Sequence, residues 1–237
     1  MPLDRRLFTG KLQSSIVYPE FFPLTVNDTV VNLGCGVGPQ VAAYKGCFKH
    51  MTCIDISQER LEQLAVFIQE KGITNYTTLR APVEHTGLPN TSFDRALCID
   101  IIEHLVDPMA LFREVHRLLR RGGTALVTIP VMHDHWVHLF KLLKRKSGGT
   151  PSKELPFGHP DHHNATLKRK EWLRLFSESP LTLEAIRATT LFPPLHLAGM
   201  KRFWFTTPWI HTIDRLLCSL PFVRDFGQSW MCIFIKP

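Results

Sequence analysis

The stretch VVNLGCGVG at residues 30–38 decides the fold. Residues 28–33 form an apolar, β-like run that leads directly into a glycine cluster, and a helix is predicted to begin near Pro39. Glycines at such a turn adopt backbone conformations that other residues avoid, and they let a ligand approach the bare chain. The spacing is G-x-G-x-G, with Pro39 where a dinucleotide fingerprint has its third glycine. A glycine loop alone is a weak signal, so the flanking sequence has to be considered with it.

Short apolar runs alternate with helix-length amphipathic stretches on the carboxyl side of this loop. The predicted strands cover residues 28–33, 51–56, 76–80, 93–99, 124–129 and 230–235. The predicted helices cover residues 58–71, with Ser57 as cap, and 108–121, closed by Gly122 and Gly123. This order favours parallel strands joined by right-handed crossovers, which is a doubly wound α/β sheet. Ligands of such sheets bind outside the carboxyl ends of the strands, so functional residues are expected there.

An acidic residue ends the second predicted strand. Asp55 stands 21 residues after Gly34, where a carboxylate can accept both hydroxyls of a ribose. The alternative is a turn aspartate that precedes the helix cap Ser57. The paired glycine loop favours the ribose interpretation.

Four segments together resemble a known family, the class I S-adenosylmethionine-dependent methyltransferases, in particular their small-molecule and quinone-type subgroup. The segments are VVNLGCGVG (30–38), CIDIS (53–57), LPNTSFDRALCIDIIEHLVDP (88–108) and LRRGGTALVTIP (119–130). They stand in the family's order and spacing over roughly residues 25–130. The resemblance implies a Rossmann-like, mostly parallel seven-stranded sheet with an antiparallel last strand, and S-adenosyl-L-methionine as cofactor, with S-adenosyl-L-homocysteine as product.

The resemblance also assigns cofactor contacts. Gly34, Cys35, Gly36 and Gly38 would approach the methionine part. Asp55 would hold the ribose, Ile56 would pack on the adenine and Val83 would lie at its edge. Ile99 and Asp100 would border the methionine part and the substrate. The family usually has acidic residues where this chain has Asn32, also assigned to the cofactor, and Pro82, so two charged contacts are missing.

Composition limits the class of protein. The chain has 237 residues, of which 44% are hydrophobic and 21% charged, as in an ordinary globular domain. No apolar run approaches the ~18–20 residues of a membrane-spanning helix, and residues 1–10 lack the apolar stretch of a secretion signal. We therefore expect a single cytoplasmic domain. The six cysteines form no C-x-x-C pair, which favours structural thiols over disulfides or metal ligands.

Histidines supply the candidate catalytic bases, and half of the twelve fall in residues 131–165. Histidine is the usual base near neutral pH. His104, which follows the fourth predicted strand, is the first candidate, and His133 and His162 come next. A packing or capping role for His104 is equally compatible with its position, which Glu103 shares. The histidine groups have no clear zinc spacing, and no metal is predicted.

The net charge of +7 indicates an anionic partner, and most of it falls in one segment. Residues 131–170 hold eight Lys or Arg against three acids. Within it, HDHWVHLFKLLKRK (133–146) would form a cationic amphipathic helix, either as an ordinary lid or on an anionic membrane surface. The aromatic stretch 203–222 could line an apolar cavity, dip into a bilayer interface or pack on the sheet edge. We expect one domain, 1–237, with a lid helix in 1–24 and substrate-side insertions at 131–165 and 191–227.

The sequence thus predicts a methyltransferase that acts on a small-molecule or lipid-like acceptor at oxygen or carbon. Two alternatives stay open. One is a degenerate relative that serves as a binding module. The other is an RNA methyltransferase that uses the basic insertion, although no recognition-helix, zinc-finger or aromatic RNA motif accompanies the charge.

Overall fold

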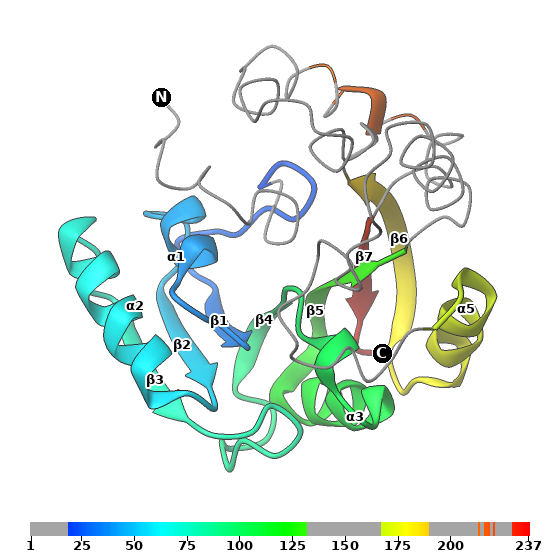
Figure 1. The fold of residues 1–237 in the computed structure, drawn as a ribbon, viewed down its shortest axis with the longest axis horizontal. Helices are drawn as coiled ribbons and strands as arrows, with labels where there is room; N and C mark the ends of the chain where they lie inside the picture. Colours follow the sequence, from blue (N-terminus) through cyan, green and yellow to red (C-terminus); the bar gives the residue numbers. More distant parts are fainter. Residues whose placement is uncertain (1–18, 132–166, 190–212, 214–215, 219, 221–228) are drawn as a thin grey trace, which may run out of the picture.

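The computed structural model describes residues 19–131, 167–189, 213, 216–218, 220 and 229–237 (Figure 1). They build a seven-stranded sheet in the order β3-β2-β1-β4-β5-β7-β6. The strands are β1 (Thr29–Leu33), β2 (His50–Asp55), β3 (Tyr76–Arg80), β4 (Phe93–Cys98), β5 (Leu119–Pro130), β6 (Thr182–Thr189) and β7 (Ser229–Ile235). Strands β1 to β5 pair in parallel, and β7 runs antiparallel to both β5 and β6. The predicted fold, including its antiparallel last strand, is confirmed.

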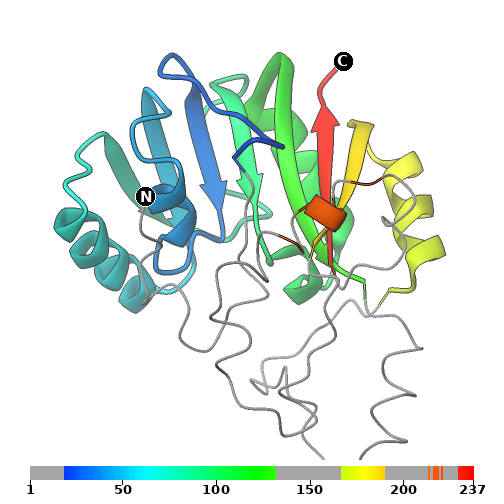
Figure 2. The ribbon, with the colours of Figure 1, turned by 90° about the horizontal axis from the view of Figure 1, so that it is seen from above.

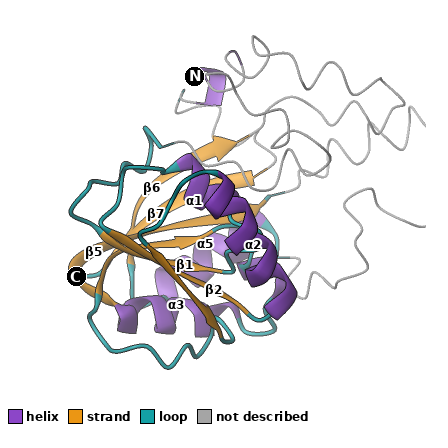
Figure 3. Cartoon of the chain, turned by 90° about the vertical axis from the view of Figure 1, so that its left-hand side faces the viewer, coloured by secondary structure: helices purple, strands orange, loops and turns teal. Residues whose placement is uncertain are grey.

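Helices cover both faces of the twisted sheet (Figures 2 and 3). They are α1 (Pro39–Ala43), α2 (Gln58–Glu70), the 3₁₀ turn η2 (Ile102–His104), α3 (Pro108–Leu118) and α5 (Arg169–Glu178). Helices α1 and α2 pack on one face, where the core includes Val30, Leu64 and Leu97. Helices α3 and α5 pack on the other, where Phe112 meets Phe176 edge to face. The chain adds β2 and β3 on one side of β1, and it then crosses to add β4 and β5 on the other side. The switch point of the sheet therefore lies between β1 and β4, beside the glycine loop.

Both longer helices after β2 and β4 begin at residues whose side chains cap them. The hydroxyl of Ser57 accepts a hydrogen bond from the backbone N–H of Arg60, as the sequence predicts. Asp107 accepts from the N–H of Met109, and Pro108 occupies the first turn, where no donor is needed. These caps fix where each helix leaves the sheet edge.

The predicted end of the helix 108–121 is wrong. Helix α3 stops at Leu118, and the two glycines expected to close it lie inside β5. They pair with the carboxyl-terminal residues, since Gly122 donates to the carbonyl of Lys236 and the N–H of Lys236 donates to that of Gly123. A Cβ on Gly123 would stand 2.8 Å from the carbonyl oxygen of Arg120, so the strand itself requires glycine there.

Residues 19–24, the described part of the proposed amino-terminal lid, form a turn, a bend and irregular chain rather than a helix. They lie against the face that α1 covers, because the hydroxyl of Tyr44 donates to the carbonyl of Phe22 at 2.9 Å. Glu20 lies 3.7 Å from Arg187 of β6, and Phe21 stacks against the same guanidinium. The segment therefore joins α1 to the far edge of the sheet. The rest of the predicted lid lies outside the described residues.

Five of the six cysteines are buried and Cys47 is exposed. The burial agrees with the structural role that the sequence predicts. In the part of the chain that the structure describes, no helix is both long and apolar enough to cross a bilayer.

Candidate functional site

The glycine loop between β1 and α1 is held open by backbone hydrogen bonds. Gly34, Gly36 and Gly38 have φ values of 74°, 54° and 85°, a region that favours glycine. The N–H groups of Gly34 and Cys35 both donate to the carbonyl of Ile54 at the end of β2, at 2.8 and 2.9 Å. Gly34 packs so closely on Ile101 that a Cβ would stand 2.7 Å from its side chain, whereas a Cβ on Gly36 would meet nothing within 4 Å. The loop therefore presents bare backbone at Gly36.

The carboxylate of Asp55 stands beside this bare backbone. Its Oδ2 accepts from the N–H of Gly36 and its Oδ1 from the N–H of Ser57, both at 2.9 Å. Asp55 is 4% exposed. A carboxylate has about four acceptor positions, so each oxygen keeps capacity for one more donor. The structure shows the turn interpretation, since Asp55 organises the turn before α2; the ribose interpretation stays a prediction, and the carboxylate faces the glycine loop as it requires.

The two apolar residues assigned to the adenine differ in exposure. Ile56 follows Asp55 directly and is 67% exposed, so its side chain offers an apolar surface next to the carboxylate. The carbonyl of Ile56 accepts from the Arg80 guanidinium at 3.1 Å, which holds the turn. Val83 is buried in the core cluster that includes Leu33 and Ile54.

The chain after β4 is brought against the glycine loop. Ile99 is buried, and Asp100 adopts φ 50°, which is uncommon for a residue other than glycine. Thr128 of β5 holds that conformation: its hydroxyl accepts from the Asp100 N–H at 2.8 Å and donates to Oδ1 at 2.9 Å. No sequence signal marked this threonine. The next residue, Ile101, packs on Gly34, and η2 begins directly after it, so η2 lies over the loop.

Asn32 is fully buried on β1, two residues before the loop, and within the described residues neither its Nδ2 nor its Oδ1 has a hydrogen-bond partner. Buried amides are normally paired, so this one is available to a group that these residues do not supply. Together with the open backbone at Gly36 and the carboxylate of Asp55, the donor and acceptor set fits an adenosine carrying an amino-acid tail.

The three predicted bases are not brought together by the described structure. His104 ends η2, is exposed, and donates its backbone N–H to the carbonyl of Ile101. His133 and His162 lie outside the described residues. Glu103, beside His104, is the more enclosed of the two at 3% exposed. Burial, with a smaller contribution from the charge of Asp100, raises the pKa of Glu103 to about 8.

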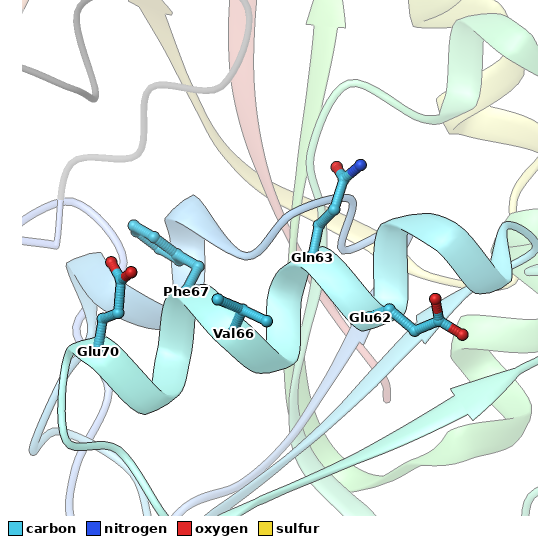
Figure 4. Close-up of a pocket in the computed structure, with 5 residues that line it drawn as sticks. All are labelled: Glu62, Gln63, Val66, Phe67 and Glu70. Carbon is cyan, nitrogen blue, oxygen red and sulfur yellow. The ribbon is translucent and has the colours of Figure 1, made fainter.

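An open hollow among the described residues lies elsewhere, on α2 (Figure 4). It has about 410 Å³ and is lined by side chains of α2 alone, namely Glu62, Gln63, Val66, Phe67 and Glu70. These side chains belong to one helix, and the hollow holds none of the residues predicted for the cofactor. Across the described ranges, no group of three or more His, Cys, Asp or Glu side chains could hold a metal ion.

Comparisons of the sequence with known proteins find methyltransferases. Residues 31–127 match the model of a family described as "Methyltransferase domain". The chain is 26% identical over 168 residues to the uncharacterized methyltransferase YcgJ of Bacillus subtilis, covering 68% of this chain and 60% of that one. It is 27% identical over 101 residues to the ubiquinone biosynthesis O-methyltransferase of Aeromonas salmonicida, covering 42% of each. The chain thus spans about 40 to 60% of the length of these relatives.

Solved structures show the same fold. The crystal structure of B. subtilis YcgJ superposes with a TM-score of 0.61 at 20% identity, over 92% of this chain and 95% of that one. Geranyl diphosphate C-methyltransferase from Streptomyces coelicolor, solved with Mg²⁺, geranyl diphosphate and S-adenosyl-L-homocysteine, gives 0.59 at 18% identity, over 90% and 72%. Residues 31–127 thus match a methyltransferase domain, and the strand order of the sheet and the position of the glycine loop are those of the methyltransferase fold.

Proposed function

We propose that this protein transfers a methyl group from S-adenosylmethionine to a small-molecule or lipid-like acceptor, at oxygen or carbon, by in-line displacement. The observation that carries the proposal is the Asp55 carboxylate, fixed by the N–H groups of Gly36 and Ser57 beside open backbone. A carboxylate oriented in this way accepts the two hydroxyls of a ribose without first having to reorganise.

The remaining assignments follow from position. The bare backbone of 34–38, including Cys35 and Gly38, accommodates the methionine part, and the amide of Asn32 offers it a donor and an acceptor. The exposed side chain of Ile56 packs on the adenine, with Val83 at the edge of that site. Ile99 and Asp100 border the methionine part on the β4 side.

When bound, the cofactor supplies an electrophilic methyl group on a positively charged sulfur. The chain has to align the acceptor with that group and exclude water, and such positioning is worth ~7–11 kcal/mol of the barrier. A general base adds ~10²–10⁴-fold only where the acceptor carries a proton of high pKa. His104 is our first candidate for that role, followed by His133 and His162.

The names of the relatives support the acceptor class. The ubiquinone biosynthesis enzymes are O-methyltransferases by name, and the structural neighbour from S. coelicolor is a C-methyltransferase of geranyl diphosphate. Ubiquinone and geranyl diphosphate both carry an apolar isoprenoid chain. An acceptor with an apolar chain, methylated at oxygen or carbon, is the simplest proposal compatible with both.

We further propose that segments 131–165 and 191–227 lie on the substrate side of the domain. The support comes from the described ends that flank them. Ser229 pairs with both Pro130 and Thr189, so the chain leaves and re-enters the sheet at three neighbouring positions. These positions stand at the carboxyl ends of β5 and β6, the edge at which such sheets bind ligands.

We propose that the protein acts in the cytoplasm, and that the basic segment 131–170 forms either an ordinary lid or a contact with an anionic membrane surface. Flotation with liposomes distinguishes the two: a protein that contacts such a surface should float with vesicles that contain acidic lipid and remain in the dense fraction with neutral ones. Failure to float with acidic vesicles would leave the segment as an ordinary lid. Tight RNA binding with a steep salt dependence would instead favour the RNA methyltransferase.

Calorimetry with S-adenosylmethionine and S-adenosylhomocysteine tests the cofactor site. The wild-type protein should bind both, and D55A should bind roughly 10- to 100-fold more weakly, because hydrogen bonds to a charged group are worth ~1.5–3 kcal/mol. D94A is the matched control. Asp94 accepts hydrogen bonds from Thr29 near the opposite end of β4, so its loss should affect stability and leave affinity unchanged. A folded wild-type protein that binds neither nucleoside would support the binding module.

A further inference from the structure

Glu103 is a carboxyl group that the described structure buries without completing its hydrogen bonds. It is 3% exposed, and among the described residues its Oε2 has no partner. Burial disfavours the charged form and, with the nearby charge of Asp100, raises its pKa to about 8, while its own backbone N–H acts weakly in the opposite direction. At neutral pH the group is therefore mostly protonated.

The elements packed against η2 bring no described cation to Glu103. Helix α3 and strand β5 contact η2, and their charged groups are engaged or placed elsewhere. Arg113 pairs with Asp107, Arg117 with Glu114, and Arg120 with Asp94. Burial and, to a smaller extent, the charge of Lys236 lower the pKa of His116. Arg121 is exposed at the start of β5. On the turn itself, His104 is exposed. Within the described ranges Asp100 is the charged side chain that acts on Glu103, and it is a like charge.

This carboxyl group lies where the cofactor loop meets the chain after β4. Gly34 packs on Ile101, one residue before η2, so the turn rests on the loop. Another buried polar group without a described partner, the Asn32 amide, lies near the end of the neighbouring strand β1, where Asn32 pairs with Leu97 of β4. Polar side chains with incomplete hydrogen bonds thus lie on β1 and after β4, at the switch point.

We propose that Glu103 is neutral in the free protein and gives up its proton when a cationic group of S-adenosylmethionine enters the site, so that cofactor binding is coupled to proton release. The inference rests on the proposed function. The carboxyl O–H bond breaks, the proton passes to the buffer, and the carboxylate remains as the counter-charge. An opposite charge within about 4–6 Å favours the ionised form, which supplies the driving force.

Calorimetry at pH 7 in buffers of different ionisation enthalpy measures the protons released. Wild type should release close to one proton more than E103Q, in which an amide of equal size cannot ionise. Affinity of the wild type should rise up to tenfold per pH unit and level off above about pH 8, whereas that of E103Q should not show this step. E62Q, on the exposed face of α2, is the control that should release protons as the wild type does. Subtracting E103Q also removes protons released by the ligand itself.

A second measurement needs no variant. Difference infrared spectroscopy of the wild type should show the loss of a protonated-carboxyl band and the gain of a carboxylate band on binding. Release with S-adenosylmethionine alone identifies the sulfonium as the cation, and release with S-adenosylhomocysteine as well identifies the ammonium. Binding with no more proton release than E103Q, and no change in the carboxyl band, overturns this inference alone. Absence of binding in every buffer overturns the proposed function instead.

Discussion

At the scale of single residues, Gly34 and Gly36 share a backbone conformation and differ in what surrounds them. A Cβ at Gly34 would press on Ile101, and one at Gly36 would enter open space. The first glycine therefore serves the packing of the fold, and the second leaves room beside the Asp55 carboxylate. Sequence spacing marked both positions but gave them the same role, because the approach of Ile101 depends on residues far along the chain.

Alanine substitutions separate these two roles. G34A, G36A and G46A should each lose about 1–2 kcal/mol of unfolding free energy, because all three glycines have positive φ. G34A should lose more, since Ile101 must also move. A Cβ on Gly36 or on Gly46 would meet nothing within 4 Å, so G46A, in the turn after α1, is the matched control for G36A. Of these two variants, only G36A should weaken the binding of S-adenosylhomocysteine. Chemical denaturation and calorimetry measure the two effects, and equal affinity of G36A and wild type would remove Gly36 from the site.

At the scale of elements, α3 is fixed to the preceding loop by a buried carboxylate. Glu114 accepts from the backbone N–H and the hydroxyl of Thr86 at 2.9 and 2.7 Å, and it pairs with Arg117. Burial alone would raise the pKa of Glu114, but the hydrogen bonds from Arg117 and Thr86 outweigh it, so the pKa is lowered. The helix that follows β4 thus owes part of its placement to a charge.

The stability contributed by Glu114 should depend on pH. Because its pKa is lower in the folded protein, the contribution is complete above the ordinary value of 4.5 and is lost as the pH falls through the folded value. The difference in unfolding free energy between wild type and E114Q should therefore be largest near neutral pH and shrink below about pH 4.5. E178Q, whose exposed pair with Arg174 contributes little, should differ from wild type by less than ~1 kcal/mol throughout. A gap for E114Q that is constant with pH would contradict this.

Element boundaries illustrate how far sequence reasoning carries. The cap at Ser57 and the bounds of β3 were predictable, because they depend on residues close in the chain. The end of α3 was not, because Gly122 and Gly123 resemble a local stop but pair with Lys236, over a hundred residues away. The burial of Glu103 is equally non-local: it arises from η2 packing on β5 and α3, which a glutamate within IIEHL does not disclose.

At the scale of the molecule, the sheet has a protected centre and two edges. Strands β1 and β4 are hydrogen-bonded on both sides and covered on both faces, whereas β3 and β6 each have one partner strand. Amide hydrogen exchange should therefore be slowest in β1 and β4, at rates close to global unfolding, and at least about tenfold faster in β3 and β6. Exchange in β3 as slow as in β1 would mean that another part of the protein covers that edge.

The pairing of Ser229 with both Pro130 and Thr189 has a consequence for the evolution of the protein and for its engineering. The connection 190–228 begins after Thr189 and ends at Ser229, which are paired residues of the β6–β7 ladder, whereas the connection after Pro130 begins at the same edge and leads to α5. Exchanging residues 190–228 for a segment of another length leaves every strand in register, so the cost in folding free energy is mainly that of closing a longer or shorter loop, about 0.6 kcal/mol per doubling. Chimaeras spliced at Thr189 and Ser229 should therefore keep the sheet and the glycine loop intact while the exchanged segment varies.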